Sequence, residues 1–239
     1  MSAPILDLGL RARLLDLENE LRAALAAEQP ADVVVKEDSI LHRSIASGFG
    51  VIVTVKEVAS LVSIDLPVNT PTGPEYLSNF GTTIGSSIAL PRAWHEPEEV
   101  ATRLLVLPHE WQHVKQYRDG VAAGWWPRAT SHSALYLAGV VAKTEAGAEY
   151  VGKVEADGYA VTEYVRAFLY GSTRPVEEVV ASLRHHYNLA TGGSTTAEAL
   201  LRSHLRDIVE EGEAPNCWAA RVCSEVFSRH ADLRGTLAG

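Results

Sequence analysis

Leucines recur at steps of three and four near the start of the chain and predict an amphipathic helix over residues 6–27. The stripe consists of Leu10, Leu14, Leu17, Leu21 and Leu25. Gln29-Pro30 ends the helix, because proline cannot continue it. Such a stripe can dock on its own domain or pair with a second subunit. We expect docking, with a homo-oligomer through this helix as the alternative.

The pattern then changes to short runs of β-branched and other apolar residues, which predict strands at 33–35, 50–55 and 61–66. A further strand-like run spans 80–91 and closes with Pro91. Proline cannot donate to a β-ladder, so this run is predicted to be an edge strand. A small sheet is therefore expected before residue 96.

Helical periodicity returns in the second half of the chain. Glu96-Pro97-Glu98-Glu99 predicts a helix start and Asp119-Gly120 a stop, while Pro108 between them predicts a kink or a fresh start. Residues 148–168 predict another helix, with a buried face made of Val151, Val154, Gly158, Val161, Val165 and Phe168. Beyond Gly171 the chain reads as further helices, including 176–183 and 197–201.

The segment His109-Glu110-Trp111-Gln112-His113 carries the candidate chemistry. Residues four apart lie on one face of a helix, so His109 and His113 can bind one metal ion. Glu110 lies one step round and can take a proton from a water molecule there. Zinc suits neutral imidazole ligands and an open coordination position. The alternative is a surface helix with two solvated histidines.

A catalytic zinc ion needs a third protein ligand, and the helix at 148–168 is the place to look. On a helical wheel Glu163 points away from the buried face, whereas Glu155 and Asp157 flank it on opposite sides. The longer side chain favours Glu155, and Asp157 is a candidate for fixing a histidine tautomer. The alternatives are that Asp157 is the ligand, or that both carboxylates are solvated.

Composition and net charge argue against several classes of binding partner. The chain has 239 residues, 46% of them hydrophobic, and a formal net charge of -9, which argues against nucleic-acid and anionic-membrane surfaces. Cys217 and Cys223 fit no Cys-x-x-Cys metal knuckle and are expected to be reduced thiols. Residues 1–30 lack a signal-peptide pattern, and no apolar run could span a membrane, so a cytoplasmic location is expected.

The stretch His-Glu-Trp-Gln-His-Val-Lys-Gln-Tyr at 109–117 resembles the zincin metallopeptidases, especially bacterial groups that read His-Glu-x-x-His-Val-x-Gln. Thr-Ile-Gly at 83–85 and Glu-Ala-Asp at 155–157 are similar to segments of those groups, so the resemblance covers residues 80–165. It implies His109 and His113 as zinc ligands and Glu110 as general base. It does not carry Glu155, because relatives often place the ligand where this chain has Lys153.

The resemblance also implies an α+β, zincin-like fold with a small mixed sheet, an active-site helix and additional C-terminal helices. We expect one domain over 1–239, with an N-terminal helix (1–30), a metallopeptidase core (33–165) and a helical C-terminal part (171–239). The implied activity is zinc-dependent hydrolysis of a peptide or protein substrate. Tyr159 and His132 are candidate oxyanion donors, and Trp125 and Trp126 can line a pocket or fill the core. A non-catalytic metal-binding or interaction protein is the alternative.

Overall fold

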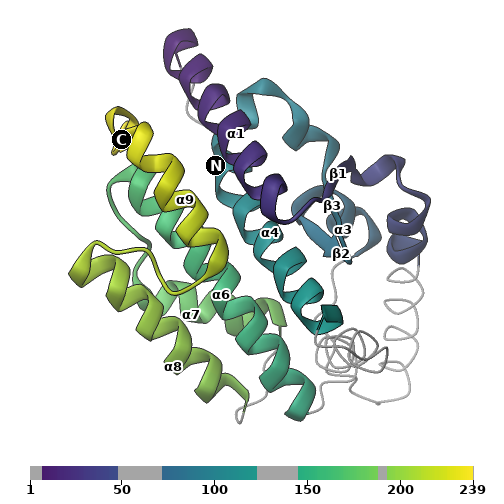
Figure 1. Cartoon of the computed structure of the whole chain (residues 1–239). Helices are drawn as coiled ribbons and strands as arrows, with labels where there is room; N and C mark the ends of the chain where they lie inside the picture. The colour runs from purple at the N-terminus through teal and green to yellow at the C-terminus, as the bar shows by residue number, and fades with distance from the viewer. Residues whose placement is uncertain (1–6, 48–71, 123–144, 188–192, 239) are drawn as a thin grey trace, which may run out of the picture.

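A computed structural model describes residues 7–47, 72–122, 145–187 and 193–238 of the chain. The strands expected at 50–55 and 61–66 lie outside the described residues, as do Trp125, Trp126 and His132. Over the described ranges the chain is mostly helical, with one small mixed sheet (Figure 1). The prediction of an α+β protein is confirmed at this level.

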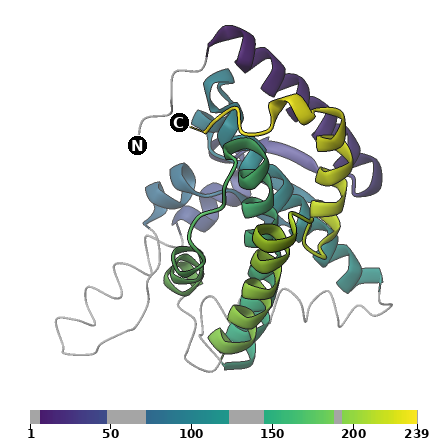
Figure 2. The ribbon, with the colours of Figure 1, turned by 90° about the vertical axis from the view of Figure 1, so that its left-hand side faces the viewer.

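Two long helices form the centre of the molecule. α4 (Val100–Ala122) packs against α6 (Glu145–Tyr170), and both contact α9 (Trp218–Arg229). The sheet lies beside α4, whereas α7 (Val176–Tyr187) and α8 (Gly193–Arg206) pack on α6. Figure 2 shows α8 lying along α6, away from the sheet. The described core therefore runs through sheet, α4, α6 and α8 in that order.

The N-terminal helix α1 (Leu8–Glu28) docks on its own chain, as predicted. Its leucines Leu14, Leu17, Leu21 and Leu25 are buried against α4 and α9. A buried ion pair adds to this contact. Arg103 of α4 donates from Nε to Glu18 Oε1 at 2.8 Å and from a terminal nitrogen to Glu18 Oε2 at 2.8 Å. The apolar stripe is thus covered by α4 and α9.

The sheet has the order β1-β3-β2. β1 (Asp32–Val35) runs parallel to β3 (Ser87–Leu90), and β2 (Thr82–Ile84) runs antiparallel to it. The prediction of one edge strand over 80–91 is wrong, because Gly85 adopts a left-handed φ of 64° and turns the run into a hairpin. β3 is the central strand, and Pro91 follows its last residue without interrupting the ladder.

A buried lysine joins the sheet to the short helix α3 (Gly73–Asn79). Lys36, at the start of the 3-10 turn η1 (Lys36–Asp38), donates to the carbonyl oxygens of Tyr76 and Phe80 at 2.8 and 3.0 Å. It also donates to Thr82 Oγ1 at 2.7 Å, and its Nζ lies 3.6 Å from the centre of the Tyr76 ring. Burial lowers the pKa of Lys36 to about 8, although the negative charge of Glu110 opposes this shift.

α4 accommodates Pro108 without a break and continues to Ala122, beyond the predicted stop at Asp119-Gly120. In α6 the predicted buried face is found, but the prediction that Glu163 points outward is wrong. Its carboxylate is fully buried, because Arg174 reaches it with Nε at 2.7 Å.

A helix over residues 40–47 and several short turns are also present in the described chain. The 3-10 turns η2 (Arg92–His95) and η3 (Pro97–Glu99) lead into α4. The short π-helix η4 (Asp207–Glu211) follows α8, and the 3-10 turn η5 (Ala231–Leu233) follows α9. After η5, the backbone N–H groups of Gly235 and Leu237 donate to the carbonyls of Phe168 and Leu169 at the end of α6. Within the described ranges, no helix has the length and apolar character needed to cross a membrane.

Candidate metal centre

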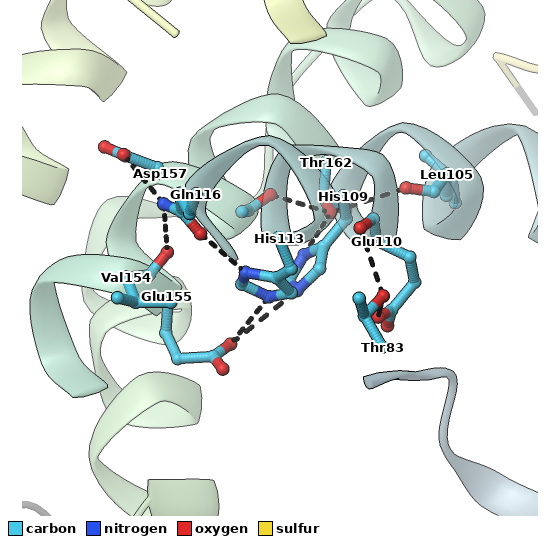
Figure 3. A network of polar contacts seen from close by, with 11 residues as sticks. Thr83, Leu105, His109, Glu110, His113, Gln116, Val154, Glu155, Asp157 and Thr162 are labelled. Carbon is cyan, nitrogen blue, oxygen red and sulfur yellow. Dashed lines mark hydrogen bonds and ion pairs between the residues drawn. The ribbon is translucent and has the colours of Figure 1, made fainter. Parts of the chain in front are cut away.

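The candidate site lies where α4 crosses α6. His109 and His113 project from α4, one helical turn apart, and Glu155 projects toward them from α6 (Figure 3). Gly158 makes the close crossing possible. A Cβ atom at this position would lie 2.7 Å from His109 Cε1 and 2.8 Å from His109 Nε2. The absence of a side chain at Gly158 therefore makes room for the His109 ring.

Three potential ligand atoms converge in this space. The Nε2 atoms of His109 and His113 are 3.0 Å apart, and each lies 3.6 Å from Glu155 Oε2. A point equidistant from all three is about 2.0 Å from each, which matches the zinc bonds formed by imidazole and carboxylate. Two imidazoles and one carboxylate also form a ligand set used by catalytic zinc sites. The residues present fit a zinc ion.

The three candidate ligands differ in how deeply their side chains are buried. The Glu155 side chain is 1% exposed, whereas those of His109 and His113 are 15% and 14% exposed. The carboxylate thus lies inside the helix packing, and the imidazoles lie at its boundary. This arrangement leaves one side of the three-atom group closer to the solvent than the other.

The electrostatics show how strongly these groups interact. Burial opposes the charged form of His113, but the neighbouring Glu155 carboxylate outweighs it and raises the pKa of His113 to about 9. Burial likewise opposes ionisation of Glu155, yet the two histidines hold its pKa well below its usual range. In the metal-free protein, charged His113 and ionised Glu155 therefore form an ion pair across the space where a divalent cation would bind.

The outer ring nitrogens of both histidines have polar neighbours. His113 Nδ1 lies 2.8 Å from Gln116 Oε1, a carbonyl oxygen that can only accept, so Nδ1 carries the proton and Nε2 is left for a metal. Gln116 is held by its amide, which donates to Val154 O at 3.2 Å and to Asp157 Oδ2 at 3.0 Å. His109 Nδ1 lies 3.2 Å from Thr162 Oγ1.

Glu110 lies outside the ligand group and is positioned by the β2 hairpin. The hydroxyl of Thr83 donates to Glu110 Oε2 at 2.7 Å, and a Cβ atom at Gly81 would lie 2.7 Å from Glu110 Oε1. In Figure 3 the carboxylates of Glu110 and Glu155 lie on opposite sides of the two rings. Glu110 is close enough to His113 for its charge to contribute to the raised pKa of that histidine. It is thus a carboxylate beside the site, not a member of the ligand group.

The structure brings together His109, His113 and Glu155, with Glu110 next to them. Asp157 does not join them. It was expected to contact a ligand histidine, but it reaches His113 only through Gln116, and its other oxygen faces His204. Tyr159 packs edge-on against the His109 ring, with centroids 5.8 Å apart, and burial raises the pKa of its hydroxyl.

Sequence reasoning assigned no role to the residues that hold the site in place, which are Thr83, Gln116 and Thr162, although Thr83 and Gln116 lie within the segments that carry the resemblance. For Gln116 a signal was available, because it lies three residues after His113 and therefore on the same helix face. Thr83 and Thr162 come from other elements, and no local spacing relates them to the motif.

No protein-family model, curated protein or solved structure matches this chain.

Proposed function

We propose that the protein is a zinc-dependent metallopeptidase. The observation that carries the proposal is the convergence of His109, His113 and Glu155 on one point, with the carboxylate of Glu110 beside them and outside the ligand group. A zinc ion bound by these residues would polarise the scissile carbonyl and make a water molecule more acidic. A purely structural zinc site has no need of the extra carboxylate.

In the proposed reaction, Glu110 moves the proton. Its carboxylate accepts a proton from the attacking water as the water oxygen bonds to the peptide carbonyl carbon. Glu110 then gives this proton to the departing amide nitrogen, and the carbon–nitrogen bond breaks. The products are a carboxylic acid and an amine, and Glu110 is ionised again. Thr83 holds one carboxylate oxygen, Oε2, and the other, Oε1, lies against Gly81.

The sheet supports a peptide as the substrate. Within the described part of the sheet, β2 pairs only with β3. Ile84 and Ser87 close the hairpin, and the next pair along the strands is Thr83 with Ile88. Such alternate residues of an antiparallel pair turn their N–H and C=O groups away from the partner strand. An extended peptide that pairs with these groups would lie next to Glu110, which Thr83 contacts.

One observation favours the alternative of a non-catalytic metal-binding protein. Glu110 is buried, and the hydroxyl of Thr83 lies 2.7 Å from its carboxylate, to which it donates, and 3.1 Å from its backbone carbonyl oxygen. A carboxylate held in this way also ties β2 to α4. In that case the residue would matter for stability and would transfer no proton.

The variant Glu110→Gln separates the two functions. We expect it to bind as much zinc as the wild type and to hydrolyse peptides at least about 100-fold more slowly, because an amide cannot accept the proton. Cleavage is measured by mass spectrometry on a proteome-derived peptide mixture, and zinc by elemental analysis. Asp119→Asn, an exposed position on the same helix, is the matched control and should cleave like the wild type.

Cleavage by Glu110→Gln at the wild-type rate would show that the role of Glu110 is wrong. Wild-type protein that holds zinc but cleaves no peptide in the mixture would support the non-catalytic alternative. Protein without zinc after purification and zinc addition would exclude both functions.

A further inference from the structure

A second group of potential metal ligands lies on the far side of Gln116. It consists of Asp157 on α6, His204 on α8 and Cys217, the residue that precedes α9. His204 Nε2 lies 3.2 Å from Asp157 Oδ1 and 3.8 Å from Cys217 Sγ. His204 and Cys217 are buried, and the Asp157 side chain is 27% exposed. Three elements distant in sequence thus bring an oxygen, a nitrogen and a sulfur to one place.

The geometry does not suit a Cys-His-Asp catalytic triad. In a triad the carboxylate and the thiol contact different nitrogens of the imidazole, whereas here both face the same atom, Nε2 of His204. A shared Nε2 is the arrangement expected when all three atoms surround one cation.

We propose that Asp157, His204 and Cys217 bind a second zinc ion, separate from the one bound by His109, His113 and Glu155. Neighbouring ligand atoms on a tetrahedral zinc are roughly 3.3–3.8 Å apart, given its usual bond lengths. The two distances to His204 Nε2, 3.2 and 3.8 Å, lie close to that range. The three donors are all common zinc ligands, and the sulfur favours zinc over the hard cations Mg²⁺ and Ca²⁺.

An ion has a route to this group. A surface pocket of about 510 Å³ is lined by Cys217, Trp218 and Lys115, among others. The partial exposure of Asp157 offers a second approach. The bound ion would join α6, α8 and the start of α9, where Asp157 already contacts His204 through its side chain and Cys217 through its carbonyl.

The second site would also be connected to the first. Asp157 uses Oδ1 toward His204 and Oδ2 toward Gln116, and Gln116 accepts from His113. Occupation of the second site would therefore fix the carboxylate that holds Gln116. The proposal concerns metal binding alone and does not depend on peptide hydrolysis.

Metal titration of the full chain tests the proposal. Metal-free protein is titrated with Co²⁺, which replaces zinc and gives a near-ultraviolet charge-transfer band only when a thiolate is a ligand. We expect the wild type to bind two ions per chain and to show this band. Cys217→Ser should bind one ion without the band, whereas the matched control Cys223→Ser should bind two and keep it, because Cys223 belongs to no ligand group in the described residues.

Two further variants separate the sites. His204→Gln should bind one ion and lose the band, which provides a second test if Cys217→Ser fails to fold. The double variant His109→Gln/His113→Gln should bind one ion and keep the band. Circular dichroism establishes that each variant is folded.

The proposal is overturned if folded wild type binds a single ion with no thiolate band, since Asp157 and His204 are then an ion pair only. A band that survives in folded Cys217→Ser would also overturn it. Wild type that binds one ion and shows the band would support the second site. That result would count against the site of His109, His113 and Glu155, on which the proposed peptidase depends.

Discussion

Each ring nitrogen of His113 faces a different neighbour, and these neighbours fix its tautomer. Nδ1 donates to Gln116 Oε1 at 2.8 Å, and Nε2 faces His109 and Glu155. A neutral imidazole carries one proton, so the contact with Gln116 determines that the nitrogen facing Glu155 is the one free to bind a metal. Gln116 therefore acts as a positioning residue.

Replacement of Gln116 tests this role. We expect Gln116→Ala to weaken zinc binding at the first site by about 10- to 100-fold, because His113 loses the acceptor that fixes its tautomer and ring orientation. Competition with a chromophoric chelator measures the affinity. The matched control is Gln112→Ala on the same helix, whose side chain accepts from Ala219 N and makes no hydrogen bond to either histidine among the described residues. Equal affinities for the two variants would contradict the positioning role.

The raised pKa of His113 predicts that zinc binding releases a proton. The pKa of about 9 means that His113 is charged at pH 7 in the metal-free protein, whereas the depressed pKa of Glu155 means that the carboxylate is already ionised. A metal ligand must be neutral imidazole. Calorimetry of Cys217→Ser, which keeps only the first ligand group, in buffers of different ionisation enthalpy should therefore detect about one proton released from His113 at pH 7, and this release should fade above pH 9.

The raised pKa of His113 also determines how the stability of the metal-free protein changes with pH. A group with a raised pKa in the folded state stabilises the metal-free fold below its unfolded value of 6.5, and this contribution is lost as the pH rises through about 9. Proton release that is absent at pH 7 would show that His113 is neutral before zinc binds. Release that is unchanged above pH 9 would show that the proton comes from a group with a higher pKa than His113.

At the scale of single residues, sequence reasoning was strongest where the geometry is local. His109 and His113 could be paired because a helix fixes their relation. Glu155 was singled out from the helical face of α6, and it lies next to both imidazoles. Asp157 flanks the same face, but its neighbours Gln116 and His204 come from other helices. Such contacts depend on how the helices pack against one another, and the spacing of residues along one helix does not predict that packing.

Among the elements, the crossing of α4 and α6 determines whether the site can form. The helices approach closely because Gly158 has no side chain beneath the His109 ring. Glycine inside a helix normally lowers stability by about 1 kcal/mol relative to alanine. At this crossing the glycine provides the space that the ring occupies.

A Gly→Ala substitution inside a helix usually stabilises a protein, but we expect no such stabilisation from Gly158→Ala. The new Cβ would lie 2.7 Å from His109 Cε1, so the ring must leave the position in which its Nε2 faces His113 and Glu155. Zinc affinity should fall at least about tenfold, and the gain of about 1 kcal/mol normally expected in a helix should be absent. Chelator competition and urea unfolding measure the two effects. A variant that is more stable and binds zinc normally would show that the crossing has room for a methyl group.

The elements also show where pattern reasoning fails. The run 80–91 was interpreted as one edge strand, but the left-handed turn at Gly85 divides it, and the strand before Pro91 becomes central. Proline blocks pairing only inside a strand, and β3 ends at Leu90. Glu163 was placed outside because a helical wheel considers one helix alone. Arg174 follows α6 and covers it.

Across the whole molecule, segments far apart in sequence meet around α4 and α6. α1 from the N-terminal part and α9 from the C-terminal part contact each other and α4. The first ligand group joins α4 to α6, and the second group joins α6, α8 and the start of α9. Metal binding would therefore act on the packing of most of the described helices.

Metal removal should accordingly lower the thermal stability of the whole chain. Zinc at 100 times its dissociation constant adds about 2.7 kcal/mol per site, which corresponds to a rise in Tm of about 5–10 °C for a chain of this size. Scanning calorimetry of chelator-treated protein with and without added zinc measures the change. Glu155→Gln should reduce the shift, whereas Glu20→Gln, a partly exposed position on α1 outside both ligand groups, should not. An unchanged Tm would contradict zinc binding to the folded protein.

Lys36 has a consequence for any strand-like ligand that pairs with β2. Its ammonium group satisfies three oxygens, including Thr82 Oγ1 in β2, so the hairpin is fixed when the protein folds. The conformational entropy of that strand is lost during folding, and none of it remains to be lost when the ligand arrives. The exposed edge of β2 would thus be preorganised for such a ligand, and the conformational entropy cost of strand pairing would fall mainly on the incoming strand.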